Sequence, residues 1–264
     1  MKSLRLHPDR FLPAEERQRS LARDLYSLAK DLPIVSPHGH TDPAWFASNA
    51  PFEDAVSLLL WPDHYLLRML YSQGVPLERL GLAPNGGGDD VENDRRRAWR
   101  LFASHYKLFR GAPSRLWLDH VSAEVCGIDV RLKEEPADLY YDTIGDKLAG
   151  ADFRPRALFR RFNIEVLATT EGALDPLAHH AKLQSEWDGR VITTFRPDDV
   201  VDPDRQDFLP NIEALGELTG ENTARWGGYL NALAARRAVF RAHGATATDH
   251  GHPTAATADL PAGD

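Results

Sequence analysis

Two histidines, His38 and His40, stand one residue apart in the segment LPIVSPHGHTDP, directly after a short apolar run. Residues two apart on an extended strand point to the same side, so both imidazoles could bind one metal ion. The intervening Gly39 would let the backbone approach a ligand closely. The alternative is a turn formed by Pro37, Gly39 and Asp42 that leaves the histidines exposed. The spacing alone does not decide, but the strand before the pair and the turn after it favour a metal site.

A second candidate segment is WPDHYLLRMLYSQGV, which contains His64, Tyr65 and Arg68. The three residues lie within about one helical turn, and His64 and Arg68 share a face because they are four residues apart. Tyr65 and His64 could polarise a carbonyl group or transfer a proton. The alternative is an amphipathic surface helix with a few polar residues, and for Arg68 this alternative is equally good.

Arg196 follows an apolar run in TTFRPD, where Pro197 restricts the backbone. At the end of a strand, an arginine presents a planar fork that matches a carboxylate. The alternative is a structural salt bridge to one of the aspartates that follow, Asp198, Asp199 or Asp202.

Asp249 and His250 occupy an equivalent strand-end position in ATATDHG. Either could reach a metal or a substrate, and either could cap a loop instead. By contrast, His179 and His180 fall in the middle of a predicted helix, where a surface or packing role is the better interpretation.

The elements that must position these side chains alternate between strands and helices in the second half of the chain, which indicates parallel βαβ units. Each predicted strand ends in polar residues, and in a parallel α/β barrel that end is where the active site is built. A closed barrel needs eight strands, whereas only four are predicted, over residues 34–38, 164–170, 190–198 and 245–251. The main predicted helices cover residues 14–30, 91–110 and 175–187.

The composition narrows the class of protein. The 264 residues carry a formal net charge of −8, which disfavours sequence-independent nucleic-acid binding because that requires a basic face. The single cysteine, Cys126, excludes an intramolecular disulfide, fits a reducing cytoplasm and is expected to be buried. We see neither a signal peptide nor an apolar run long enough to span a membrane. The chain is therefore predicted to be a cytoplasmic protein without nucleic-acid or membrane partners.

Five segments in this order together resemble the uronate isomerase family, the glucuronate isomerase branch of the amidohydrolase-like (β/α)8 barrels. They are LPIVSPHGHTDP, LLLWPDHYLLRMLYSQGV, RFNIEVLATTEGALDPLAHH, TTFRPDDVVDP and ATATDHG. The resemblance covers about residues 10–251 and implies an α/β fold of the TIM-barrel type. It also implies an aldose–ketose isomerase that converts D-glucuronate to D-fructuronate and D-galacturonate to D-tagaturonate.

The resemblance also implies roles for the candidate residues. His38 and His40 would bind a divalent metal, usually zinc. His64, Tyr65 and His250 would be catalytic. Arg196, Arg68 and Asp249 would contact the uronic acid substrate.

The resemblance is to the N-terminal part of the family only. We therefore expect a single partial barrel domain over residues 1–264, with a helical insertion at about residues 75–163 and an irregular tail at 252–264. Such a chain is expected to be poorly active on its own, and a homo-oligomer is possible. The competing functions are a metal-dependent hydrolase of the same superfamily and a non-catalytic module that binds sugar acids.

Overall fold

The structure, a computed structural model, describes residues 2–83, 87 and 90–251. The chain divides into two compact units, each with its own hydrophobic core. The first comprises Met1–Leu32 and Ala50–Leu158, and the second comprises Pro33–Asn49 and Phe159–Asp264. The prediction of a single domain stays a prediction, and the irregular tail expected at 252–264 lies outside the described residues.

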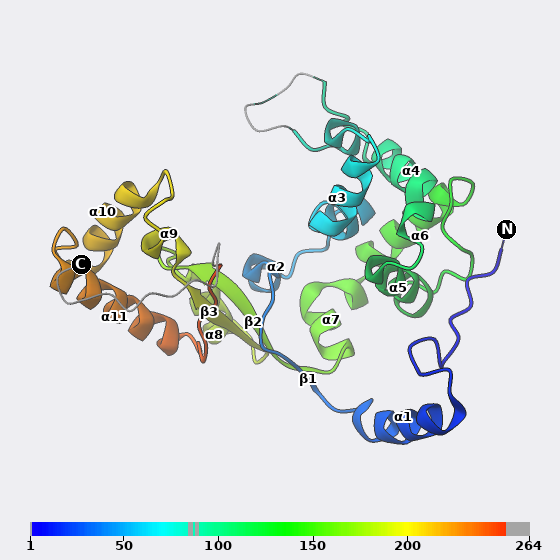
Figure 1. The fold of residues 1–264 in the computed structure, drawn as a ribbon, viewed down its shortest axis with the longest axis horizontal. Helices are drawn as coiled ribbons and strands as arrows, with labels where there is room; N and C mark the ends of the chain where they lie inside the picture. Colours follow the sequence, from blue (N-terminus) through cyan, green and yellow to red (C-terminus); the bar gives the residue numbers. More distant parts are fainter. Residues whose placement is uncertain (1, 84–86, 88–89, 252–264) are drawn as a thin grey trace. The chain divides into compact units, whose positions relative to one another are not determined.

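The first unit is helical, and it includes most of the segment predicted as a helical insertion (Figure 1). Its core is rich in aromatic side chains: Trp99, Phe102 and Tyr106 are almost completely buried, and the Trp99 indole donates a hydrogen bond to the Ala137 carbonyl (3.0 Å). Cys126 is buried, as predicted. The longer helices are α1 (Glu16–Ala29), α3 (His64–Ser72), α4 (Arg95–His105), α5 (Pro113–His120) and α6 (Ala137–Ala149), with α7 (Pro155–Arg161) at the boundary. Shorter helical turns cover Val56–Leu60, Leu77–Leu80, Tyr106–Phe109, Val121–Val125 and Ala151–Phe153.

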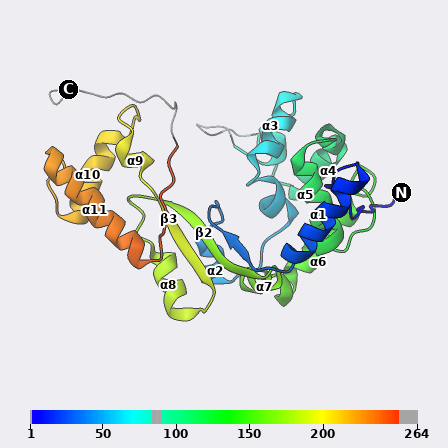
Figure 2. The ribbon, with the colours of Figure 1, turned by 60° about the horizontal axis from the view of Figure 1, so that its bottom comes forward.

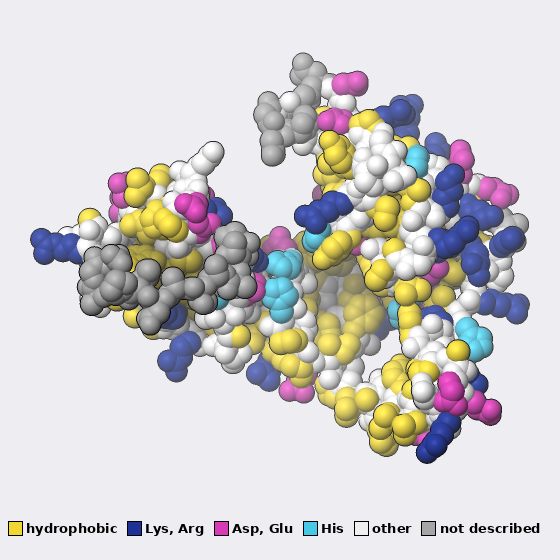
Figure 3. Space-filling model, viewed as in Figure 1, with side chains coloured by type: hydrophobic (Ala, Val, Ile, Leu, Met, Phe, Trp, Pro, Cys, Tyr) yellow, Lys and Arg dark blue, Asp and Glu magenta, His cyan; other side chains and the backbone are white. Residues whose placement is uncertain are grey.

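Helix α1 confirms the helix predicted over residues 14–30. It begins after Glu15, whose carboxylate caps the helix by accepting hydrogen bonds from the backbone amides of Arg17 and Gln18. Its apolar residues Leu21, Leu25 and Leu28 recur at helical spacing, yet they are 60%, 60% and 77% exposed. Figure 3 shows hydrophobic side chains over this helix. The periodicity thus predicts the helix correctly, but α1 contains no buried residue.

The second unit contains a three-stranded parallel sheet in the order β1 (Ile34–Ser36), β2 (Ile164–Gly172) and β3 (Arg190–Arg196). Helix α8 contacts α2 and β3, whereas α11 contacts β3 and α10 (Figures 1 and 2). Two small apolar clusters result, one around Leu167 and Leu183 and the other around Phe195 and Phe240. The helices of this unit are α2 (Pro43–Ser48), α8 (Ala178–Glu186), α9 (Asp198–Val201), α10 (Phe208–Thr219) and α11 (Trp226–Ala242).

Two strand predictions need correction. The strand expected over 245–251 is present only as one parallel bridge between Thr248 and Phe195, because the segment pairs with β3 at that point alone. Strand β1 was expected to be of the buried type, but Ile34 and Val35 are 49% and 57% exposed. The reason is that β1 is an edge strand, which pairs with β2 alone among the strands of the described residues.

A cluster of buried polar residues joins β2, β3 and α8. The Thr169 hydroxyl donates to the Ile192 carbonyl (3.2 Å) and lies 2.9 Å from His180 Nε2, so its oxygen accepts the Nε2 proton. His180 Nδ1 is then a bare acceptor, and it has no hydrogen-bond partner among the described residues. The carboxylate of Glu171 accepts a hydrogen bond from Thr193. The prediction of a packing role for His180 is confirmed, since the side chain is 1% exposed.

This cluster predicts a loss of stability in mild acid. Burial lowers the pKa of His180 from 6.5 to about 4, because the charged imidazolium would lose its hydration. The unfolded chain therefore binds this proton at a higher pH than the folded chain does. The free energy of unfolding should fall by about 2 kcal/mol between pH 7 and pH 5. Burial raises the pKa of Glu171. Protonation of this carboxyl group in acid therefore raises the free energy of unfolding and partly offsets the effect of His180.

Urea unfolding followed by circular dichroism at pH 7 and pH 5 tests this expectation. The variant His180→Gln keeps a donor for Thr169 but cannot titrate, so it should lose less stability than the parent chain over the same interval. An equal loss in the two proteins would rule out His180 as the source.

Candidate active site at the strand ends

His38 and His40 lie in the loop between β1 and α2. Their rings are edge to face, with centroids 4.9 Å apart and planes at 83°. The loop is held against β2, because the Thr170 hydroxyl donates to the Gly39 carbonyl (3.0 Å). A Cβ atom at Gly39 would lie 3.3 Å from the Ala168 carbonyl oxygen, so a larger residue would push the loop away from the strand. The glycine between the histidines therefore permits close packing on the sheet.

Asp249 connects this loop to the end of β3. Its backbone amide donates to the Phe195 carbonyl (3.0 Å), which places the aspartate at the strand edge. Its Oδ2 atom then lies 3.5 Å from His38 Nδ1 and accepts a hydrogen bond from Arg196 Nη1 (3.4 Å). One carboxylate thus lies between an imidazole and a guanidinium.

Arg196 is also bound from its other side. Its Nε donates to Asp198 Oδ2 (2.7 Å), and the same oxygen accepts from the Gly251 amide (2.9 Å). His250 Nδ1 lies 3.9 Å from the other oxygen of Asp198. The hydrogen bond to Asp198 raises the pKa of Arg196. Burial acts to raise the pKa of Asp198, but the bonds from Arg196 and Gly251 outweigh it and leave that pKa below its usual value.

The second unit therefore brings together five of the predicted site residues: His38, His40, Arg196, Asp249 and His250. The arrangement combines two imidazoles that could donate to a metal, a charged arginine fork and two carboxylates. The salt bridge from Arg196 to Asp198, which was an alternative from the sequence, is present. It does not exclude contact with a substrate, because Arg196 remains about one-third exposed.

The other three predicted residues, His64, Tyr65 and Arg68, belong to the first unit and lie on α3. Asp63 caps this helix by accepting from the Tyr65 and Leu66 amides (2.9 and 3.1 Å). The rings of His64 and Tyr65 are 4.2 Å apart, and both side chains are exposed. Their predicted roles at the site stay predictions.

The donor set matches a metal only in part. Within residues 2–83, 87 and 90–251, no group of three or more His, Cys, Asp or Glu side chains is placed to hold a metal ion. A catalytic zinc site usually takes three ligands from the protein. His38 and His40 could supply two, and Asp249 is engaged by Arg196. The described residues therefore supply two of the three protein ligands that such a site usually takes.

Two further residues of this unit were not among the predicted site residues, although the sequence named Asp198 as an alternative salt-bridge partner of Arg196. Asp198 orients Arg196, and the R-P-D spacing of TTFRPD was the available signal. Arg236 on α11 is 5% exposed and donates to the carbonyls of Ala173 (2.7 Å) and Asp175 (2.6 Å), which fixes the loop after β2. No sequence signal identified Arg236, because one arginine in an amphipathic helix usually lies on its solvated face.

The family model of glucuronate isomerase matches residues 7–261. The chain belongs to the glucuronate isomerase family. It is 63% identical over 262 residues to the uronate isomerase of Rhizorhabdus wittichii, a match that covers 99% of this chain and 55% of that protein. It is 58% identical over 260 residues to the uronate isomerase of Phenylobacterium zucineum, covering 98% of this chain and 54% of that protein. The chain thus spans about half the length of the curated relatives it matches.

Solved structures of the same family have the same α/β fold. The crystal structure of glucuronate isomerase from Caulobacter crescentus matches with a TM-score of 0.94 and 53% identity, over 99% of this chain and 55% of that one. Uronate isomerase from Thermotoga maritima matches with a TM-score of 0.82 and 29% identity, over 93% and 51%. None of the described helices of this family member is long and apolar enough to cross a membrane.

Proposed function

We propose that this chain forms part of a uronate isomerase that interconverts D-glucuronate and D-fructuronate, and D-galacturonate and D-tagaturonate. The observation that carries the proposal is the position of Arg196, a partly exposed guanidinium at the end of β3 that is joined through Asp249 to His38. A uronic acid presents a carboxylate at one end and its aldehyde and hydroxyl groups at the other, which suits an arginine fork next to proton-transfer groups. Membership of the glucuronate isomerase family supports the same reaction.

The reaction requires no net oxidant. A base removes the C2 proton of the aldose while the C1 carbonyl oxygen takes up a proton, which gives an enediol. The C2 hydroxyl group then loses its proton and becomes the carbonyl group, while an acid delivers a proton to C1. We assign the substrate carboxylate to Arg196, with Arg68 and Asp249 as further substrate contacts. We assign the proton transfers to His64, Tyr65 and His250.

Charge balance supports a divalent metal, zinc in our proposal, with His38 and His40 as two of its ligands. Asp198 and Asp249 carry two negative charges against the single positive charge of Arg196, so the array would repel a uronate. A divalent cation beside the histidines would reverse this sign. When bound, such an ion would hold substrate oxygens and stabilise developing negative charge.

We further propose that the sheet is part of an amidohydrolase-like (β/α)8 barrel that further strands complete. The exposed edge of β1 supports this, because Ile34 and Val35 are apolar yet accessible, and uncovered apolar edges are rare in stable sheets. We infer a cytoplasmic enzyme, and a homo-oligomer is compatible with the exposed apolar face of α1. On this proposal the described half-site gives little activity without the rest of the barrel.

The test uses the complemented chain, meaning this chain co-expressed with the part of the Caulobacter crescentus enzyme that the match does not cover. Zinc-supplemented preparations are incubated with D-glucuronate, D-galacturonate, a sugar lactone and a sugar amide. We expect both uronates to be converted to their ketoses and neither the lactone nor the amide to be hydrolysed. Hydrolysis without isomerisation, or saturable uronate binding without turnover, would reject the proposal.

A further inference from the structure

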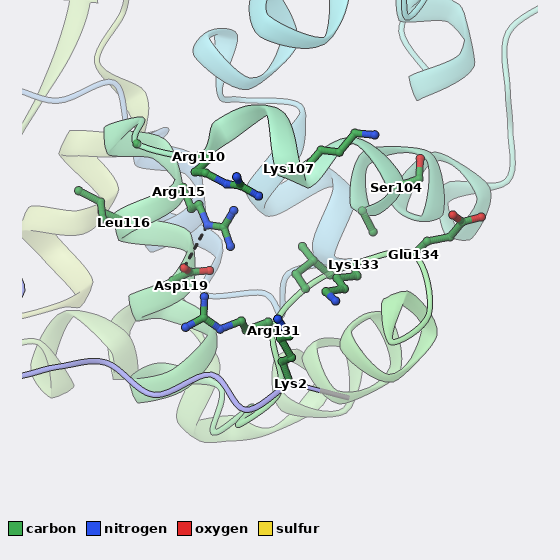
Figure 4. Close-up of a pocket in the computed structure, with 13 residues that line it drawn as sticks. Lys2, Ser104, Lys107, Arg110, Arg115, Leu116, Asp119, Arg131, Lys133 and Glu134 are labelled. Atoms are coloured by element: carbon green, nitrogen blue, oxygen red, sulfur yellow. Dashed lines mark hydrogen bonds and ion pairs between the residues drawn. The ribbon is translucent and has the colours of Figure 1, made fainter.

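The first unit contains a cavity of about 750 Å³ that lies outside the candidate active site. Its walls come from four segments: the N-terminal segment at Lys2, the end of α4 with the turn after it, α5, and the loop before α6 (Figure 4). The volume is in the range of sites for small molecules, roughly 300–1,000 Å³. Six of its lining residues are cationic: Lys2, Lys107, Arg110, Arg115, Arg131 and Lys133.

Most of the cations in this cavity form no ion pair within the described residues. In the part of the chain that the structure describes, only Arg115 among the six forms an ion pair, with Asp119 (3.4 Å). Asp119 also accepts a hydrogen bond from the Tyr106 hydroxyl group (2.9 Å). The one other acidic lining residue is Glu134. The lining therefore carries an excess of positive charge, although the whole chain has a net charge of −8.

Elsewhere in the same unit, several arginines pair with acids, although others such as Arg17 and Arg154 form no ion pair within the described residues. Arg95 pairs with Asp54, and Arg96 and Arg100 pair with Asp138. The cavity thus gathers five cations without an ion pair within the described residues, whereas these three arginines lie next to carboxylates. Figure 3 shows Lys and Arg side chains gathered over this unit.

Backbone pairing forces the like charges together. The Leu4 amide donates to the Asp129 carbonyl (2.6 Å), and the Arg131 amide donates to the Lys2 carbonyl (3.0 Å). The Arg131 Nε also donates to the Ser3 carbonyl (3.1 Å), which leaves its terminal nitrogens available. Lys2 and Arg131 are therefore held side by side on paired backbone, and Lys133 follows two residues later. Clustered like charges repel one another, and a bound anion would relieve this repulsion.

The arrangement of these groups indicates the chemistry of the anion. In Figure 4, Arg110 and Arg115 lie on one side of the cavity and Arg131 and Lys133 on the other, while the Lys107 ammonium group points away. A single arginine can bind a planar carboxylate by donating two parallel hydrogen bonds from its guanidinium group. Cations on opposite sides instead match a group with oxygens in several directions, such as a phosphoryl group or a chain of them.

We propose that this cavity binds a small metabolite that carries two or more phosphoryl groups. The site is separate in sequence and in unit from the strand-end site, and it takes a different ligand. Inorganic pyrophosphate is the simplest probe of this chemistry. Isothermal titration calorimetry of the full chain should show one saturable site whose affinity falls as salt rises, because ion pairing is screened.

The variant Arg110→Glu/Lys133→Glu tests the location, because both side chains are exposed and form no ion pair in the described structure. We expect the affinity for pyrophosphate to fall about tenfold or more. The neutral variant Arg110→Gln/Lys133→Gln should have an affinity between those of this variant and the parent. The matched control Arg17→Glu/Arg154→Glu makes the same change of net charge at exposed positions outside the cavity and should alter affinity by roughly twofold or less. Circular dichroism confirms that each variant is folded.

Three results would overturn the proposal. The first is no saturable binding of pyrophosphate at millimolar concentration, or equal affinity in the cavity variant and the parent. The second is citrate binding as tightly as pyrophosphate, which would reject phosphoryl recognition. The third is single-stranded RNA that binds the cavity more tightly than pyrophosphate does, which would indicate a nucleic-acid surface instead.

Discussion

Replacing Arg196 by methionine is expected to lower kcat/KM for D-glucuronate by roughly 30- to 150-fold in the complemented chain. The variant keeps roughly the volume of the side chain but removes the proposed charge-assisted hydrogen bonds to the substrate carboxylate, worth about 2–3 kcal/mol. It also leaves Asp198 and Asp249 without their cation, so the site repels a uronate more strongly. Steady-state kinetics with a coupled assay for the ketose measures the effect.

A neutral substrate separates binding from folding in this experiment. With D-glucuronamide, which lacks the carboxylate charge, the same substitution should change kcat/KM by roughly threefold or less. Arg205→Met is the matched control, because Arg205 also donates two hydrogen bonds to carboxylate oxygens, both of Asp207 (3.0 and 2.9 Å), outside the site. Equal losses with both substrates would show that Arg196 supports the structure rather than the carboxylate.

Removing both imidazoles of the histidine pair should abolish specific metal binding. In His38→Ala/His40→Ala, zinc affinity measured by calorimetry is expected to fall by about 100-fold or more, since both protein donors of the proposed half-site are lost. The complemented variant should also bind D-glucuronate more weakly, because Asp198 and Asp249 would no longer be balanced by a divalent cation.

The control for this prediction removes two histidines elsewhere in the same unit. His179 is exposed and His243 is partly exposed, and His243 Nδ1 contacts Gln184 (3.0 Å) outside the site. His179→Ala/His243→Ala should keep the zinc affinity of the parent chain. An unchanged affinity in the His38 and His40 variant would place the metal elsewhere or exclude it.

Local signals in the sequence predicted much of the fold. The apolar runs at 164–170 and 190–198 are strands β2 and β3, because buried parallel strands need continuous apolar sequence. The periodicity of Leu21, Leu25 and Leu28 predicted α1 correctly. It could not predict their exposure, because burial depends on what packs against the helix. For the same reason the apolar residues of β1 suggested a buried strand, although the structure pairs β1 on one side only.

The candidate site was predictable residue by residue but not as a set of contacts. Arg196 and Asp249 are 53 residues apart, and they meet because the chain bridges Phe195 to Thr248 in parallel register. Strand-end position suggested that they share an edge, but only the register determines which oxygen meets which nitrogen. Arg236 acts on backbone carbonyls, and those contacts have no signature in residue type. The sequence can therefore predict where a side chain lies along a strand, but it does not predict the hydrogen-bond partner of that side chain.

The most direct test of the central claim is product formation from D-glucuronate in D2O, followed by proton NMR. The complemented chain with zinc should form D-fructuronate and should incorporate solvent deuterium at C1 during proton transfer through the enediol. The Arg196→Met variant should do both far more slowly, and the Arg205→Met control should match the parent. Failure of the folded, metal-loaded assembly to form any ketose would contradict the assignment of this strand-end site to uronate isomerisation.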